Sequence, residues 1–198
     1  MLTALAQAHE WRTAGPDGGP LAVNVNLSAR ELGQAELARS VADAIAATGV
    51  DPAAICFEIT ESALLHDLDA TRATLRQLKG LGVGLSIDDF GTGFAPLTFL
   101  RRFPVDGLKI DRSFVSGLEA ETADRAIVAA VVGLAHALDL TATAEGVETE
   151  RQLDALRELG CDAAQGFYLA PPVLAHELVP ELALVMSPAT RRRETSST

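Results

Sequence analysis

Short apolar runs recur along the chain, and between them lie segments in which apolar residues return every three or four positions. Short apolar runs are typical of buried strands, whereas the longer spacing is typical of amphipathic helices. Strands that alternate with helices favour a parallel sheet or a (β/α) barrel of the TIM type. The six strands are predicted at residues 21–27, 54–61, 82–87, 107–111, 140–146 and 163–169.

Helical segments separate these strands. Residues 122–138 form the clearest helix, because their apolar side chains fall on one stripe. Ser28 with Glu31 resembles a capping box that opens a short helix. The remaining helices are predicted at residues 2–13, 36–48, 68–79, 96–102, 148–159 and 173–185.

Each predicted strand ends in polar or charged side chains. In (β/α) barrels the chemistry lies at the carboxyl ends of the strands. A single such residue could be a cap, but carboxylates or amides at five ends and a lysine at the sixth are hard to explain by capping. The residues at these ends are Asn26, Glu58 with Glu61, Asp88 with Asp89, Lys109 with Asp111, Glu145, and Gln165.

The adjacent carboxylates Asp88 and Asp89 follow an apolar strand and precede a glycine-rich loop. Two anions this close repel each other, and burial raises that cost unless a cation neutralises them. Side chains alternate along a strand, so the two aspartates begin on opposite faces, and at a frayed strand end before Gly91 both could turn toward one metal cluster. The pair by itself is equally compatible with one aspartate capping the loop and the other in water.

Composition limits the possible functions. The 198 residues suffice for one domain, with 48% hydrophobic and 22% charged residues, as in soluble globular proteins. We expect a domain at residues 1–186 and a disordered polar tail at 187–198. The net charge of -11 argues against binding to DNA or to anionic membranes. The longest apolar run, residues 126–135, is shorter than the roughly 20 residues of a spanning helix, so membrane insertion is not expected.

The cysteines and the N-terminus indicate a cytoplasmic protein. Cys56 and Cys161 lie in apolar contexts without CxxC spacing, which favours buried free thiols in a reducing compartment. The N-terminus shows no signal-peptide pattern.

The polar strand ends favour a divalent metal. Oxygen ligands from Asp, Glu and Asn suit Mg²⁺ or Mn²⁺, and the four scattered histidines disfavour zinc. A carboxylate-rich site with one lysine suits phosphodiester hydrolysis, in which two metals clamp the attacking and leaving oxygens. Lys109 could orient the water or stabilise phosphoryl charge. The alternative for Lys109 is a plain ion pair with Asp111 or Asp106.

Six short motifs mark the polar strand ends in order along the chain. They are Asn24-Val-Asn-Leu-Ser28, Glu58-Ile-Thr-Glu-Ser62, Asp88-Asp-Phe-Gly-Thr-Gly93, Leu108-Lys-Ile-Asp111, Ala144-Glu-Gly-Val-Glu148 and Gln165-Gly-Phe167. Together they closely resemble the EAL domain family, which hydrolyses the bacterial second messenger cyclic di-GMP to linear pGpG. The set is far more specific than any one motif, and the resemblance runs from the first helix to about Pro172.

The resemblance implies a two-metal site that uses Mg²⁺ or Mn²⁺. It implies that Lys109 positions the attacking water and that Glu145 is an essential carboxylate and candidate base. It also implies that Gln165 contacts the metal-bound water or the substrate. The implied metal ligands are Asn26, Glu58 and Asp88, with Asp89 on the second metal.

The resemblance also assigns supporting roles around the metals. Glu61 resembles the glutamate that anchors the glycine-rich loop, residues 90–97, which in the family couples metal binding to dimer packing. A homodimer through this loop is therefore an expectation. Asp111 and Glu148 are expected to support the ligands from behind.

The chain departs from the family pattern at its start. It contains no Glu-Ala-Leu motif, whose glutamate is a metal ligand, and lacks the arginine that follows it. The family barrel has eight strands, and six are predicted here. Minor departures are Phe94 and Phe167 in place of a common Tyr, and Pro171 in place of a frequent Arg.

Three explanations of these departures are open. The true start could lie upstream of Met1, the chain could be a remnant that binds without catalysis, or another chain could supply the missing strands. We favour the first, because the later motifs are intact. We therefore expect an N-terminally truncated EAL domain that hydrolyses cyclic di-GMP weakly or not at all by itself. The alternative is an inactive EAL-like module that binds cyclic di-GMP or a protein partner.

Overall fold

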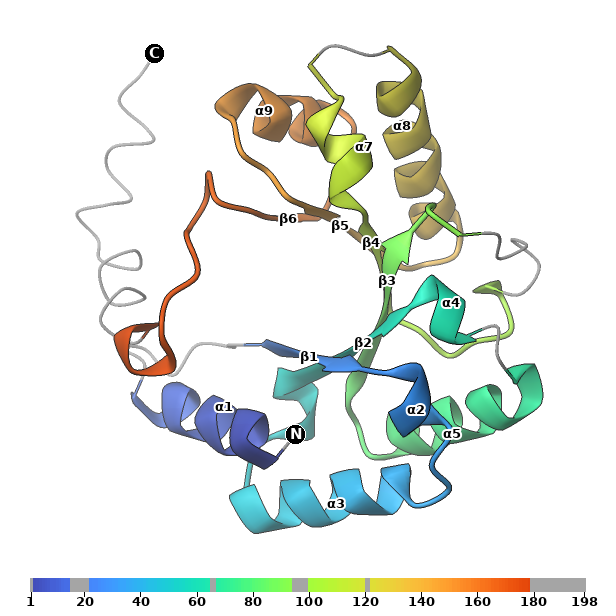
Figure 1. Cartoon of the computed structure of the whole chain (residues 1–198), viewed down its shortest axis with the longest axis vertical. Coiled ribbons are helices and arrows are strands. Elements are labelled where there is room, and N and C mark those ends of the chain that lie inside the picture. Colours follow the sequence, from blue (N-terminus) through green and yellow to red (C-terminus); the bar gives the residue numbers. More distant parts are fainter. Residues whose placement is uncertain (1, 15–21, 65–66, 94–99, 120–121, 179–198) are drawn as a thin grey trace.

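A single curled parallel sheet forms the centre of the molecule in the computed structural model, which describes residues 2–14, 22–64, 67–93, 100–119 and 122–178 (Figure 1). Its strands pair in the order β1-β2-β3-β4-β5-β6, so every strand lies beside its neighbour in the sequence. The strands are β1 (Val23–Leu27), β2 (Ile55–Thr60), β3 (Gly84–Phe90), β4 (Gly107–Ile110), β5 (Thr141–Glu145) and β6 (Ala163–Gln165).

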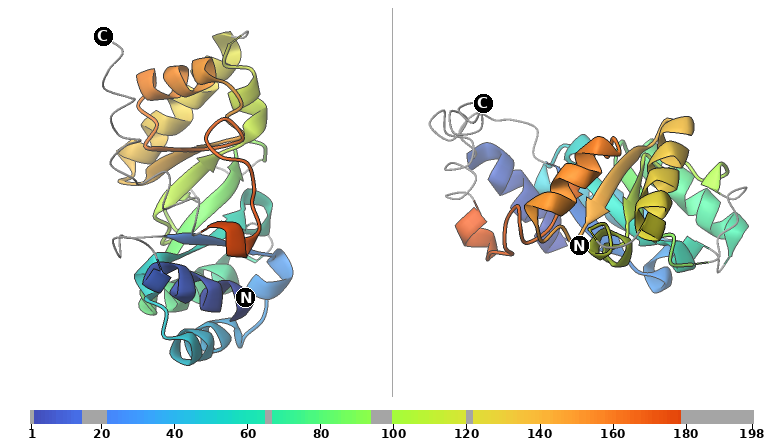
Figure 2. Two further views of the ribbon diagram at one scale, coloured as in Figure 1. Left: turned by 90° about the vertical axis from the view of Figure 1, so that its left-hand side faces the viewer. Right: turned by 90° about the horizontal axis from the view of Figure 1, so that it is seen from above.

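Helices cover the convex side of the sheet (Figures 1 and 2). The predicted (β/α) barrel of the TIM type, incomplete with six strand–helix units, is confirmed: the sheet curls into a half-barrel. Within the described residues β1 and β6 form its two edges and do not pair with each other. The helices are α1 (Leu2–Ala14), α2 (Ala29–Leu32), α3 (Leu37–Thr48), α4 (Glu61–Leu64), α5 (Leu68–Gly80), α7 (Arg112–Ser116), α8 (Thr122–Ala137) and α9 (Glu150–Glu158), with a 3-10 turn at Pro52–Ala54.

The hydrophobic core lies between the sheet and these helices. Side chains alternate along each strand, so Ile55, Phe57 and Ile59 of β2 face the helices and are at most 1% exposed. The concave face carries small and polar side chains instead, such as Ser86 and Thr143. Closed barrels fill this space with bulky branched residues. The concave face therefore presents polar groups, whereas the convex face packs against the helices.

Several element boundaries differ from the sequence prediction. The strand predicted to end at Glu61 ends at Thr60, because Glu61 begins α4. The strand predicted at 163–169 ends at Gln165, because the backbone then turns to bond with Val147. The strand predicted at 82–87 runs on to Phe90. The capping box of Ser28 and Glu31 is confirmed.

Some predictions fall on residues that the structure does not describe. The polar tail at 187–198 and most of the predicted helix at 96–102 lie outside the described residues. Of the predicted final helix, residues 175–178 are helical and the part from 179 onward lies outside them. Among the described helices, none combines the length and the apolar character required to cross a membrane.

The segment after β6 crosses the open side of the half-barrel toward α1 (Figures 1 and 2). The indole Nε1 of Trp11 in α1 donates a hydrogen bond to the carbonyl of Ala175 at 3.0 Å. The segment carries four large apolar side chains that are exposed. They are Phe167, Tyr168, Leu169 and Leu174.

Candidate metal and catalytic site

A buried lysine lies at the centre of the charged cluster on the concave face. Lys109 extends from β4 and is 4% exposed, while its neighbours Leu108 and Ile110 face the helices. Its Nζ lies 2.7 Å from Oε1 of Glu58 and 3.4 Å from Oδ1 of Asp88, and it also contacts Oε1 of Glu145. One ammonium thus gathers carboxylates from three other strands.

Ion pairing fixes the charge of this lysine. Burial would lower the pKa of Lys109, but hydrogen bonds to Glu145 and Glu58 outweigh burial and hold that pKa above its ordinary value. The ammonium therefore stays protonated at neutral pH and cannot serve as a base. Burial raises the pKa of Glu145, although its hydrogen bond to Lys109 opposes the rise. Because Lys109 already carries its proton, Glu145 is the member of the pair that can accept one.

Three carboxylates form a cluster suited to a cation. Asp88, Asp89 and Glu145 each offer an oxygen, and these oxygens lie within 4.8 Å of one another. Burial and then the charge of Asp88 raise the pKa of Asp89. Oxygen ligands at this spacing fit a hard divalent ion, whose charge would relieve their repulsion. The carboxylates of this cluster, which include the predicted ligands Asp88 and Asp89, thus suit a divalent ion such as Mg²⁺ or Mn²⁺.

A strand irregularity brings the two aspartates together. The register between β3 and β4 shifts between Ile87 and Phe90, and Asp89 adopts a φ of 54°. A bulge of this kind places successive side chains toward the same side of a sheet. The sequence predicts that a frayed strand end brings the two aspartates together. Instead, both aspartates lie within β3, and the backbone N–H of Asp89 donates to Asp88 Oδ1 at 3.1 Å.

Two amide residues of the predicted site, the ligand Asn26 and the water or substrate contact Gln165, lie level with the charged cluster. Asn26 pairs in register with Glu58, and Gln165 pairs with Glu145. Both amide residues are exposed on the concave side. Their positions place them at the rim of the cluster.

A pocket of about 300 Å³ opens beside the carboxylates. Asp111 caps α7 and accepts a hydrogen bond from the backbone N–H of Ser113 at 2.9 Å. The pocket therefore joins the predicted supporting residues to the cluster and to one arginine. Its lining residues are Asp89, Asp111, Arg112, Glu145, Gly146, Glu148, Gln165, Gly166 and Phe167.

The side chain of Glu61 holds the start of the glycine-rich loop by hydrogen bonds to its backbone. Its side chain is buried, and Oε2 accepts hydrogen bonds from the N–H groups of Gly91 at 3.1 Å and Gly93 at 3.2 Å. A Cβ at Gly93 would lie 2.6 Å from Glu61 Oε1, so this close approach requires glycine. Residues 94–99 of the loop lie outside the described residues.

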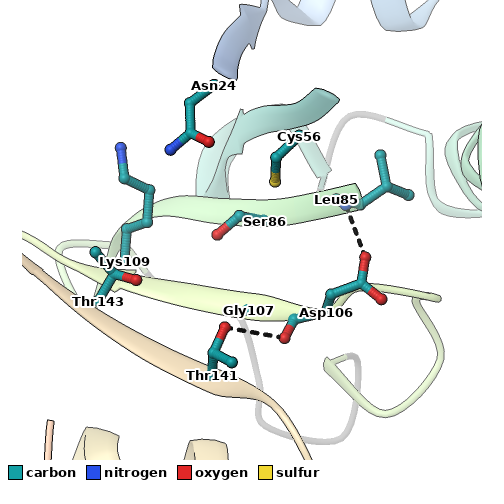
Figure 3. A pocket seen from close by; sticks show the side chains of 9 residues that line it. All are labelled: Asn24, Cys56, Leu85, Ser86, Asp106, Gly107, Lys109, Thr141 and Thr143. Atoms are coloured by element: carbon teal, nitrogen blue, oxygen red, sulfur yellow. Dashed lines mark hydrogen bonds between the residues drawn. The ribbon is translucent and has the colours of Figure 1, made fainter. Parts of the chain in front are cut away.

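Sequence reasoning assigned no role to Asn24. Its Nδ2 donates a hydrogen bond to Glu58 Oε1 at 2.6 Å. The signal was present, because Asn24 and Asn26 alternate with valine and leucine on β1 and therefore share a face. Both Asn24 and Lys109 line a cavity of about 180 Å³. Figure 3 shows their side-chain nitrogens extending toward the same region of this cavity.

Comparisons with known proteins agree on one family. The model of the EAL domain matches residues 1–172. The bifunctional diguanylate cyclase/cyclic di-GMP phosphodiesterase MucR of Pseudomonas aeruginosa is 45% identical over 169 residues, covering 84% of this chain and 25% of MucR. The cyclic di-GMP phosphodiesterase NbdA of the same organism is 44% identical over 153 residues, covering 77% of this chain and 20% of NbdA. The chain thus spans a quarter or less of these relatives.

Solved structures show the same likeness. The P. aeruginosa MucR phosphodiesterase in complex with c-di-GMP superposes with a TM-score of 0.84 at 42% identity, covering 89% of this chain and 71% of that chain. The EAL domain of Mycobacterium smegmatis DcpA gives 0.87 at 41% identity, covering 94% and 83%. A manganese/cy-diGMP complex of Klebsiella pneumoniae BlrP1 gives 0.76 at 32% identity, covering 84% and 41%.

Proposed function

The chain belongs to the EAL domain family, and from this premise we propose that its site hydrolyses cyclic di-GMP to pGpG with two divalent ions, Mg²⁺ or Mn²⁺. The observation that carries the proposal is the convergence of Glu58, Asp88 and Glu145 on the buried ammonium of Lys109. The names of MucR and NbdA support the choice of substrate.

Four of the residues would bind the two divalent ions. When bound, divalent ions would polarise the phosphodiester and lower the pKa of the attacking water. Asn26, Glu58 and Asp88 would hold one ion, and Asp89 would hold the second. These four residues supply the oxygen donors that Mg²⁺ and Mn²⁺ prefer.

Proton transfer and charge stabilisation fall to the remaining residues. Glu145, whose pKa is raised, would accept the proton of the attacking water as the general base. Lys109, held protonated by its partners, would orient that water and stabilise negative charge on the phosphoryl oxygens. Gln165 lines the adjoining pocket and would contact the water or the substrate.

Turnover by the 198-residue chain alone should be slow. The glutamate of the family's Glu-Ala-Leu motif and the arginine after it do not occur in this sequence. A missing ligand misplaces the attacking water, and a small misplacement costs on the order of 100-fold in rate.

The test is a hydrolysis assay on two proteins. The first is the 198-residue chain, and the second is the same chain preceded by the Glu-Ala-Leu strand region of a complete EAL domain. Each is incubated with Mn²⁺ and cyclic di-GMP, and pGpG is followed by chromatography. We expect turnover by the longer protein and its loss on chelation with EDTA. A folded, metal-loaded longer protein without turnover would contradict the proposal.

A second candidate is a catalytically inactive module that binds cyclic di-GMP or a protein partner. The linear strand order favours it, because β1 and β6 are unpaired at their outer edges within the described residues. Calorimetry separates the two candidates: binding of cyclic di-GMP to the 198-residue chain without pGpG formation supports the module, and pGpG formation rejects it.

We also propose a homodimer through the loop at residues 90–97, and a cytoplasmic location. The hydrogen bonds from Gly91 and Gly93 to Glu61 tie the start of this loop to β2 and α4, close to the metal ligands. Light scattering of the chain with and without Mn²⁺ tests the dimer. The free thiols Cys56 and Cys161 suit a reducing compartment.

A further inference from the structure

Two nitrogen donors converge on one oxygen of Glu58. Asn24 Nδ2 lies 2.6 Å from Glu58 Oε1, and Lys109 Nζ lies 2.7 Å from the same atom. The Glu58 side chain is 6% exposed. A buried carboxylate with both donors on Oε1 is restrained about its terminal torsion, which is otherwise broad. Oε2 remains as the oxygen available to a metal ion.

The sheet register explains how Asn24 reaches this atom. Asn24 pairs with Cys56, whereas Asn26 pairs with Glu58, so Asn24 lies one pleat deeper on the concave face. From this position the side-chain amide of Asn24 extends along the concave face to Oε1 of Glu58, whereas Asn26 lies directly beside Glu58 in the sheet register. The two asparagines of β1 thus approach the same glutamate from different depths.

The donors differ in chemistry. Lys109 supplies charge and is shared among three carboxylates. Asn24 is neutral, and Glu58 is the partner of its amide N–H. Loss of Asn24 therefore removes directional restraint from Glu58 and leaves the local charge unchanged.

We propose that Asn24 is a positioning residue that holds Glu58 in the orientation required for metal binding. The inference rests on the proposed function, because it takes Glu58 as a ligand. Partners of metal-binding side chains typically change metal affinity by 10- to 100-fold when they are removed.

The test measures Mn²⁺ affinity of the 198-residue chain by calorimetry and by Mn²⁺ EPR, without substrate. Asn24→Ala removes the donor, and Asn24→Leu removes it while keeping a similar side-chain volume. We expect both variants to bind Mn²⁺ at least about tenfold more weakly than the natural sequence. Thr143→Val removes a hydroxyl from the wall of the same cavity and keeps its shape, so its affinity should be unchanged.

A second readout separates positioning from loss of structure. If Asn24 acts through the ligand geometry, excess Mn²⁺ restores binding and the thermal stabilisation by metal in Asn24→Leu, whereas a misfolded variant does not recover. Natural affinity in Asn24→Leu, or a loss that Thr143→Val shares, would overturn the inference.

Glu58→Ala distinguishes failure of this inference from failure of the proposed function. If Glu58→Ala weakens Mn²⁺ binding and Asn24→Leu does not, the metal site stands and the role of Asn24 is wrong. If the natural chain and Glu58→Ala bind Mn²⁺ equally, Glu58 is no ligand, and both the proposed site and the role of Asn24 are wrong.

Discussion

At the scale of single residues, Lys109 supplies the positive charge that the clustered carboxylates require in the metal-free protein. It contacts Glu58, Asp88 and Glu145 and is almost fully buried. Removing one partner of a buried ion pair leaves an uncompensated charge, which is far more costly than losing an exposed pair.

Lys109→Met should therefore destabilise the metal-free chain by about 3 kcal/mol and abolish hydrolysis in the longer protein. Urea unfolding gives the stability, and the chromatographic assay gives the activity. Lys79→Met is the matched control, because Lys79 pairs with Asp106 at 2.8 Å in a partly exposed place. The control should lose no more than about 1 kcal/mol. Equal losses in the two variants would contradict the buried-charge interpretation.

The raised pKa of Glu145 predicts a pH dependence of stability. Burial raises that pKa above its unfolded value of 4.5, so the folded chain binds the proton more tightly than the unfolded chain. The contribution is fully present below pH 4.5 and is lost as pH rises through the folded pKa. The difference in stability between the natural chain and Glu145→Gln should therefore fall as pH rises above 4.5.

Urea unfolding of both proteins across this range, with EDTA, measures that difference. Mn²⁺ binds the ionised carboxylates, so its addition should offset the loss for the natural chain. A difference that rises with pH would show that Glu145 is stabilised as the anion in the metal-free protein.

At the scale of elements, β3 and the loop after it decide where the chemistry lies. The alternation of strands and helices was predictable, because apolar spacing reports burial. The bulge in β3 was not, because register depends on the neighbouring strand β4. The sequence likewise predicts Glu61 on a strand. In the structure Glu61 begins α4, and its side chain accepts hydrogen bonds from the N–H groups of Gly91 and Gly93.

The same distinction applies to the candidate site. The strand-end rule selected Glu58, Asp88, Lys109 and Glu145, which the structure brings into contact. The strand-end rule overlooked Asn24, because Asn24 lies two residues before Asn26 on β1. Its amide contacts the site only through the long side chain of Glu58 on the neighbouring strand β2. The roles of these residues in metal binding and catalysis remain predictions.

Two glycine substitutions should have opposite effects on stability. Gly93→Ala places a Cβ 2.6 Å from Glu61 Oε1, so Glu61 must move and its bonds to the loop weaken. We expect a loss of about 1–3 kcal/mol. Gly133 lies within α8 with nothing near its added Cβ, and Gly133→Ala should stabilise the chain by about 0.5–1 kcal/mol. Thermal unfolding measures both, and a stabilising Gly93→Ala would contradict the anchoring by Glu61.

At the scale of the whole molecule, the segment after β6 ties the two ends of the arc together. Trp11 and Ala175 are 164 positions apart in sequence and share a hydrogen bond. The sheet itself does not join these ends within the described residues. The hydrogen bond between Trp11 and Ala175 therefore connects α1 to the C-terminal segment across the open side of the half-barrel, and we call this contact the clasp.

Trp11→Phe keeps the aromatic ring and removes the N–H donor. We expect faster cleavage by protease between residues 166 and 178 and a loss of roughly 1 kcal/mol in stability. Limited proteolysis with mass spectrometry locates the cuts. Trp11→Ala should cleave faster still, and an unchanged cleavage rate in both variants would show that the clasp is unimportant.

The linear strand order has a consequence for how the chain assembles on the ribosome. Each new strand finds its partner in the strand synthesised just before it, because β1 to β6 pair in sequence order. Sheet growth can therefore keep pace with translation, one strand–helix unit at a time. Lys109 emerges after Glu58 and Asp88 and before Glu145, so the nascent chain always has a counterion ready when the last of these carboxylates arrives. The Trp11–Ala175 bond joins positions 164 apart in sequence, so it can form only after Ala175 has been synthesised.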